Sequence, residues 1–528
     1  MRITGECESV TKKPRLFEKN NASASHSIAT ACGFIALWLA LLTGCSSIPQ
    51  VPTEHILMFS GRGYPVDPTG NIGCANEPAP CNGSHFWLTA YPEMGPDRYD
   101  AYLSDLFKAM KHDAPVVNGK KQLLIFIHGG LNTQVGTIER AADLHQSIKA
   151  AGYFPIFVNW QSSLFSSYLD HLLYIRKSQD LGWRGVPFAP FYLLTDVARS
   201  VARAPVVWAF PFWNDRRSLP FITPESETDA MEIARDIKKE GIIDLHWEEE
   251  DNRNKTEMIL SGFSWLVTLP TKLLTAPFID AFGKSAWDIM LRRTELLYHT
   301  DGEFSTESDV AKRAHKEKGY QHVQADGGLS VFMRRLQDEM ARNGGTKAWD
   351  ITLVGHSMGT IVLNRMIRDF GTSSSGTMPF NRIAYMAAAT TIKDYEDSIF
   401  PYLAKNHDAE FYHLTLHKRA EISDRWEPIP YVDLPPRGSL LVWVDEFLAN
   451  PATLHDRTAG RFTNLTVALH DTPEELRRRI HIKEFKVGAS LQGTNPQKHG
   501  DFTDPFTFWK QECWQPKSPI SPACFPRK

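Results

Sequence analysis

The chain has 528 residues, of which 42% are apolar and 23% are charged, and its formal net charge is −3. This composition excludes an intrinsically disordered chain and a polytopic membrane protein, and the small net charge excludes a strongly basic nucleic-acid-binding protein. Because α/β domains often exceed about 200 residues as one unit, we expect one large domain with additions.

The N-terminal segment has the pattern of a secretory signal. An uncharged stretch at residues 28–42, which is short for a bilayer span, follows the basic residues Lys12, Lys13, Arg15 and Lys19. The stretch ends in Leu42-Thr43-Gly44-Cys45, which resembles the bacterial lipobox. The resemblance implies that residues 1–44 are removed, that Cys45 carries a lipid and that Ser46 directs the protein to the outer membrane. An ordinary N-terminal anchor is the alternative.

The cysteines agree with export. Removal of residues 1–44 and lipidation of Cys45 leave four thiols, two near each end of the remaining chain. An exported chain of this kind is expected to form two disulfides. We favour the local pairs Cys74 with Cys81 and Cys513 with Cys524, although four cysteines allow three connectivities. The sequence has no CxxC pair with His or Cys partners downstream, so we do not expect a structural zinc site.

A strand–helix–strand unit is predicted in the first third of the chain. A helical pattern at residues 99–111 precedes a continuous apolar run at residues 122–127, which is typical of a parallel strand buried on both faces. An amphipathic segment at 137–150 then leads to a second apolar strand at 154–159. Short links between these segments favour a βαβ unit.

Residues 161–325 interrupt this alternation, and we interpret them as a mainly helical cap inserted between core strands. Helices are expected at residues 191–204 and 269–298. Three charged residues in the first of these helices argue against a membrane span: Asp196, Arg199 and Arg203. Six tryptophans pack the cap in one interpretation, and line an acyl pocket or touch lipid in another: Trp183, Trp208, Trp213, Trp247, Trp265 and Trp287.

Alternating helices and strands then resume. The expected helices are residues 329–342 and 360–370, and the expected strands are residues 350–354, 383–388, 410–416 and 480–487. The segment Gly355-His356-Ser357-Met358-Gly359 lies between the strand at 350–354 and the helix at 360–370. A lone G-x-S-x-G occurs by chance ~0.2 times in such a chain. Its position between a strand and a helix is what a nucleophile elbow requires, so Ser357 is the predicted nucleophile.

A glycine-rich turn follows the strand at 122–127. His128-Gly129-Gly130 resembles the oxyanion loop of lipases and esterases. The resemblance implies that the backbone N–H groups of Gly130 and Met358 hold the oxyanion. We expect His128 to be structural and not a base.

The general base is expected after the last core strand. His499 combines that chain order with a loop position, and an aromatic helix is expected after it. His413, His417 and His481 lie in or beside strands, where packing or surface roles are expected. Together these residues predict a serine and a histidine in the order that the fold requires.

The acid of the triad is left open between carboxylates that follow the strand at 410–416. Glu421 is closer to the end of the strand, whereas Asp424 is an aspartate, the commoner acid in such triads. We favour Glu421 slightly. Asp394, after the preceding strand, is a third option that more readily begins a helix.

These motifs together resemble the α/β-hydrolase superfamily, specifically bacterial esterase-like or lipase-like lipoproteins. The resemblance implies a mostly parallel central sheet with helices on both faces, and serine ester hydrolysis without a metal or organic cofactor. We expect a signal peptide at 1–44, an N-terminal extension at 45–120, the core at 121–160 and 326–510, the cap at 161–325 and a tail at 511–528.

Three functional hypotheses remain. The first is an esterase or lipase that acts on acyl esters near a membrane, supported by the expected lipid anchor and the apolar cap. The second is an acyltransferase that uses the same nucleophile. The third is a catalytically inactive hydrolase fold that serves as a binding lipoprotein, and the paired serine and histidine motifs count against it.

Overall fold

The computed structural model describes residues 53–69, 91–176, 179–214, 225–240, 244–246, 255–299, 326–372, 378–425, 434–488, 495–515 and 524–525. The chain divides into two compact units, residues 1–47 and residues 48–528, and all the described residues belong to the second. The expected signal peptide, Cys45, Cys74 and Cys81 therefore lie outside the described residues.

The described residues form a nine-stranded, mostly parallel sheet. Its order is β1-β4-β3-β8-β9-β10-β11-β7, and β2 pairs with β3 beside this path. Each neighbouring pair along the path is parallel, while β2 and β3 are antiparallel. The strands are β1 (Ile56–Phe59), β2 (Val116–Val117), β3 (Lys120–Ile127), β4 (Phe154–Trp160), β7 (Asp244–His246), β8 (Trp349–His356), β9 (Phe380–Met386), β10 (Glu410–Thr415) and β11 (Ile480–Glu484).

The central strands form because their side chains are apolar on both faces. In β3 the five side chains from Leu123 to Ile127 are all buried, and β8 and β9 are buried over most of their lengths. Parallel strands need crossovers, and the helices of those crossovers cover the sheet on both sides. The predicted α/β architecture and its six predicted strands are confirmed.

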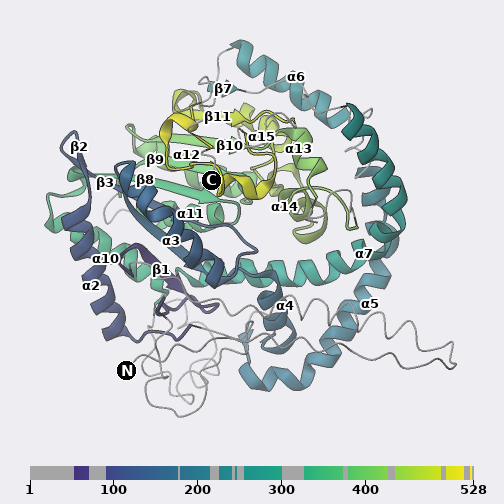
Figure 1. The fold of residues 1–528 in the computed structure, drawn as a ribbon, viewed down its shortest axis with the longest axis horizontal. Helices are drawn as coiled ribbons and strands as arrows, with labels where there is room; N and C mark the ends of the chain where they lie inside the picture. Colours follow the sequence, from purple (N-terminus) through teal and green to yellow (C-terminus); the bar gives the residue numbers. More distant parts are fainter. Residues whose placement is uncertain are drawn as a thin grey trace, which may run out of the picture. The chain divides into compact units, whose positions relative to one another are not determined.

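Helices lie around the sheet (Figure 1). The helices that connect the strands are α2 (Pro96–Asp113), α3 (Gln134–Ala150), α10 (Gly328–Arg342), α11 (Gly359–Met366), α12 (Ile392–Lys405), α13 (Lys418–Ser423), α14 (Leu440–Trp443) and α15 (Phe462–Ala468). A π-helical turn at Ile367–Gly371 continues α11 to the end of the helix expected there. The alternation of helices and strands is therefore as predicted.

Residues 161–325 contribute most of the remaining helices. They include α4 (Leu164–Leu173), α5 (Ala189–Val207), the π-helical turn η3 (Phe210–Asn214), α6 (Glu225–Glu240) and the long α7 (Lys255–Leu296). Helix α7 curves around one side of the sheet (Figure 1). The same region also supplies β7, which pairs with β11 at the sheet edge. The segment expected to be a cap thus adds a strand to the core sheet.

The second half of α7 packs against the body of the protein. Trp287 and Met290 are buried there, and the Arg293 guanidinium is buried where it pairs with Asp170 of α4 at 2.6 Å. In the described part of the chain, one helical segment, Ile259–Leu296, is long and apolar enough to cross a membrane. Length and composition alone do not separate such a helix from the core helix of a soluble protein.

A disulfide joins Cys513 to Cys524, with the Cα atoms 5.9 Å apart. Both cysteines are buried, and the Phe525 ring lies 5.3 Å from that of Phe506. This local pair confirms one of the two expected disulfides.

Candidate active site

Ser357 occupies a strained turn between β8 and α11. Its φ is 52°, a left-handed value that costs a non-glycine residue about 1 kcal/mol or more. Hydrogen bonds to the Ser357 backbone hold the turn: the Ser357 N–H donates to the Met386 carbonyl at 2.9 Å, and the Thr360 hydroxyl donates to the Ser357 carbonyl at 2.7 Å. The Ser357 hydroxyl is buried and makes no hydrogen bond with another described residue.

The two glycines of the motif are required by close contacts. A Cβ atom at Gly359 would lie 2.2 Å from the Ile127 carbonyl oxygen of β3, and one at Gly355 would lie 2.6 Å from Leu363 Cδ1. Contacts under 3 Å do not occur for real Cβ atoms, so a side chain at either position would displace the turn. The sequence-based reason for these glycines is confirmed.

The glycine-rich loop after β3 packs directly against this turn. A Cβ atom at Gly129 would lie 2.8 Å from Ser357 Cβ, and one at Gly130 would lie 2.6 Å from Met358 Sδ. Neither the Gly130 N–H nor the Met358 N–H donates a hydrogen bond to another described residue. Two backbone donors are therefore placed close to the Ser357 turn, as an oxyanion site requires.

His128 fixes this loop with both of its ring nitrogens. Nε2 accepts from the Trp160 N–H at 3.1 Å, so Nδ1 carries the proton and donates to the Gly129 carbonyl at 2.7 Å. Burial lowers the pKa of His128 to about 3, which keeps the ring neutral. These contacts match the expected structural role.

His499 lies at the start of a short 3₁₀ helix, η13 (His499–Phe502), after β11. Its ring is buried, and neither ring nitrogen has a hydrogen-bond partner among the described residues. Burial lowers the pKa of His499 to about 4, so the imidazole is neutral at pH 7 and able to accept a proton. Turns, and not the expected aromatic helix, follow η13, and Phe502 and Phe506 pack there against Phe485.

Asp424 is the carboxylate in contact with the histidine segment. Its Oδ2 accepts the backbone N–H of His499 at 3.3 Å, and its Oδ1 accepts the N–H of Arg425 at 2.8 Å. Burial raises the pKa of Asp424 to about 6. No hydrogen bond joins the Asp424 carboxylate to the His499 ring.

Glu421 is held elsewhere. It is buried in α13, its Oε2 accepts the hydroxyl proton of Ser439 at the start of α14, and its Oε1 has no partner among the described residues. Burial raises the pKa of Glu421 to about 8, so it is mostly protonated at pH 7. Asp394 lies in the first turn of α12, where its backbone N–H donates to the Thr391 hydroxyl, and its carboxylate pairs with Arg368. The structure therefore brings Asp424, and not Glu421 or Asp394, into contact with the histidine segment.

His356 is a site residue that the sequence did not indicate. Its Nε2 lies 3.1 Å from the His499 carbonyl oxygen and donates to it, and the two rings lie 4.9 Å apart. Burial, and then the nearby His499, lower the pKa of His356. The second position of G-x-S-x-G accepts any residue, so only the fold reveals that this side chain supports the histidine segment.

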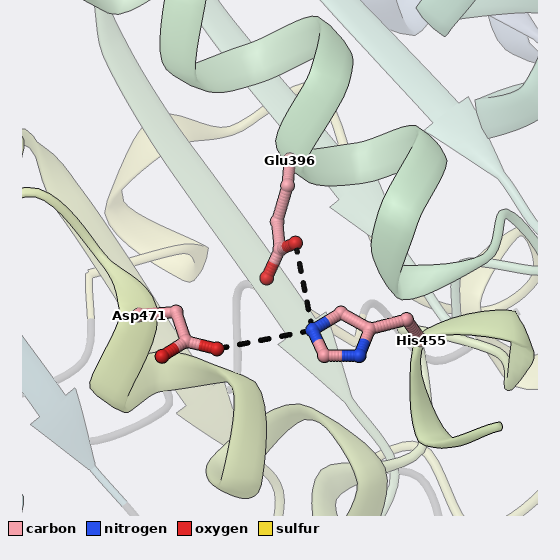
Figure 2. A group of neighbouring side chains, drawn as sticks. All are labelled: Glu396, His455 and Asp471. Carbon is pink, nitrogen blue, oxygen red and sulfur yellow. Dashed lines mark ion pairs between the residues drawn. The ribbon is translucent and has the colours of Figure 1, made fainter.

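One group of side chains in the described part of the chain has the donors of a metal site (Figure 2). His455 Nε2 lies 3.9 Å from Glu396 Oε2 and 3.8 Å from Asp471 Oδ2. Glu396 belongs to α12, and His455 and Asp471 belong to two short 3₁₀ helices, Leu454–Asp456 and Leu469–Asp471. His455 and Asp471 are exposed, as expected for a surface ion-pair group.

The segments that carry these residues follow β3, β8, β10 and β11, all parallel strands of one sheet. Carboxyl ends of parallel strands share one edge of a sheet, which is where ligands bind in open α/β proteins. A buried hydroxyl, nearby N–H donors and a neutral imidazole are the groups that nucleophilic acyl transfer uses. No protein-family model, curated protein or solved structure matches the chain.

Proposed function

We propose that the protein is a serine hydrolase that cleaves carboxylic esters through Ser357. The observation that carries this proposal is the buried Ser357 hydroxyl, which lies on a positive-φ turn against the Gly129–Gly130 loop. A strained serine without a hydrogen-bond partner costs stability, so a turn with a purely structural role has no use for it.

The order of the functional segments supports assignment to the α/β-hydrolase fold. The glycine loop follows β3, the nucleophile follows the neighbouring β8, the carboxylate follows β10 and the histidine follows the next strand, β11. This succession of nucleophile, acid and histidine is the one that α/β-hydrolases use. It also makes Asp424 a better candidate acid than Glu421, because Asp424 contacts the histidine segment.

In the proposed mechanism, His499 removes the proton of the Ser357 hydroxyl as Oγ attacks the ester carbonyl. The Gly130 and Met358 N–H groups stabilise the oxyanion, and His499 returns the proton to the departing alkoxide. Water, activated by His499, then hydrolyses the acyl-enzyme and releases the carboxylic acid. Since no hydrogen bond joins the His499 ring to Ser357, this bond must form when substrate binds.

Ionised Asp424 stabilises the His499 cation that forms during this transfer. It also holds the segment through the His499 N–H, while His356 holds the His499 carbonyl. These two bonds fix both sides of the same residue. Positioning of this kind contributes to catalysis because a misplaced base loses its alignment with the hydroxyl.

Labelling with a fluorophosphonate probe tests the proposal. Wild-type protein should become covalently labelled and should hydrolyse p-nitrophenyl esters, and Ser357→Ala should do neither. The matched control is Ser439→Ala, which removes a buried serine of α14 that lies outside the proposed site. Equal labelling of wild type and Ser357→Ala would refute the assignment. Product analysis with an added alcohol separates hydrolysis from acyl transfer.

We further propose that the protein is an exported lipoprotein of the outer membrane, anchored through Cys45. The Cys513–Cys524 disulfide supports an oxidising compartment, because disulfides rarely persist in the cytosol. Radiolabelled palmitate should be incorporated into the wild-type protein and not into Cys45→Ala, whereas an unlabelled wild type that keeps its leader would favour an ordinary anchor.

A further inference from the structure

The helices α5 and α7 have an inverted distribution of polarity. The exposed side chains of α5 are apolar except for Thr195, while its three charged residues face inward. Asp196 accepts the Tyr168 hydroxyl at 3.0 Å, and Arg199 and Arg203 pair with the buried Asp280 of α7 at 3.6 and 2.8 Å. Water normally draws charged side chains outward and leaves apolar ones inside. This pair of helices does the opposite.

The first half of α7 continues the same pattern. Every exposed residue from Ile259 to Phe278 is apolar, and Lys272 is buried with its ammonium on the Pro435 carbonyl at 2.7 Å. The exposed residues recur every three or four positions, so they form one face of the helix. Beyond Phe278 the exposed residues include Asp288, as in an ordinary soluble helix.

We propose that this apolar face inserts into one leaflet of a lipid bilayer. The face is defined by large exposed side chains of α5, η3 and α7: Leu193, Leu194, Val201, Val206, Phe212, Ile259, Leu260, Phe263, Leu266, Val267, Leu274 and Phe278. The two helices pack together, since the Trp208 indole N–H donates to the Leu273 carbonyl at 2.7 Å. So many exposed apolar side chains exceed what a soluble monomer usually leaves uncovered.

The tryptophans favour lipid over a protein partner. Trp183 lies just before α5, and Trp208 and Trp213 lie just after it; all three are exposed. Tryptophan is enriched where apolar segments meet the polar surface of a membrane. Trp265 and Trp287, by contrast, are buried, and Trp247 lies outside the described residues. Exposed tryptophans at both ends of an apolar helix are thus the arrangement expected of a helix lying in a bilayer interface.

Insertion would place the proposed active site close to the acyl layer. The Ser261 hydroxyl of α7 accepts from Arg425, the residue that follows Asp424, at 2.9 Å. The expected lipid on Cys45 would also hold the protein at a membrane, because only seven residues lie between Cys45 and Thr53, the first described residue. The membrane contact itself rests on the helices and does not depend on the proposed hydrolysis.

Flotation with uncharged phosphatidylcholine vesicles tests the inference. The full chain carrying Cys45→Ala has no lipid at that position and should still float with the vesicles. Combining Val201→Ser, Leu266→Ser and Leu274→Ser should lower the partition coefficient about tenfold or more, because three exposed apolar groups are lost. The matched control is Val116→Ser on β2, which is 62% exposed, compared with 69% for Val201, and should bind like its parent.

Retained binding by the triple variant would overturn the proposal. The proposal would also be overturned if the parent failed to bind vesicles and formed a dimer by light scattering that the triple variant abolished. The apolar face would then bind a second copy of the chain. If the triple variant unfolds, the tryptophan fluorescence of the parent is measured in vesicles with brominated acyl chains. Insertion predicts that the fluorescence is quenched, and absence of quenching refutes insertion. Ser357→Ala should bind like its parent, which separates this test from that of the hydrolase.

Discussion

The central sheet and the α5–α7 pair bury opposite kinds of side chain. The sheet buries apolar side chains such as those of Leu123 to Ile127, whereas the helical pair buries Asp280 beside two partly exposed arginines and exposes apolar residues. The proposed insertion into lipid accounts for this difference, because each pattern is favourable only next to its own solvent. The comparison teaches that burial in this protein has to be judged region by region.

The largest expected effect is on catalysis, at the carboxylates that follow β10 of the sheet. Asp424→Asn should lower kcat/KM for ester hydrolysis about a thousandfold, because the His499 cation would lose its stabilising charge. Glu421→Gln should lower it by less than about tenfold, since Glu421 bonds to Ser439 and not to the histidine segment. Steady-state kinetics of both variants measure the difference. Equal losses would return Glu421 to consideration as the acid.

The pH profile sharpens the same point. The proposed mechanism needs ionised Asp424 and neutral His499, whose pKa values are raised to about 6 and lowered to about 4 by burial. Wild-type kcat/KM should therefore rise with pH through about 6. In Asp424→Asn the remaining activity should rise near pH 4 instead. An unchanged midpoint in that variant would show that Asp424 does not control the acidic limb.

The α5–α7 pair can be tested by removing the charge of the buried Asp280. Asp280→Asn should lower the free energy of unfolding by about 1–3 kcal/mol, because Arg199 and Arg203 would keep their positive charge with only an amide beside them. The exposed Asp288, which pairs with Lys284, serves as the control, and Asp288→Asn should cost less than about 0.5 kcal/mol. Denaturant unfolding measures both values. Equal stabilities would show that the buried charges do not hold the helices together.

A pH-dependent effect concerns a buried carboxyl beside the sheet, Glu421. Burial raises the pKa of Glu421 from 4.5 to about 8, so between these values the folded protein keeps a proton that the unfolded chain loses. The free energy of unfolding should therefore fall with rising pH by up to ~1.4 kcal/mol per pH unit on this account. Glu421→Gln cannot lose a proton, and its Tm relative to wild type should rise from pH 5 to pH 8. A constant difference would contradict the buried, protonated state.

The strands could be predicted from the sequence where they are five or more residues long. Buried runs such as residues 122–127 appear as β3 because both faces of a central parallel strand are covered. Strands β1 and β7 escaped prediction because four and three residues are too few for a periodic signal. In α5 the charged residues argued against a membrane span; in the fold they face inward and leave an apolar surface outside.

Sequence alone determined the turn that carries Ser357 and the chain order of its proposed partners. Ser357 between two glycines, the glycine loop of residues 129–130 and His499 could be named because turn geometry and chain order are local properties. Only the tertiary structure decided that Asp424 contacts His499, that His356 supports it and that Asp280 receives two arginines. These contacts join residues 75 to 143 positions apart, and the packing of separate elements, not the pattern within any one of them, determines which side chains meet.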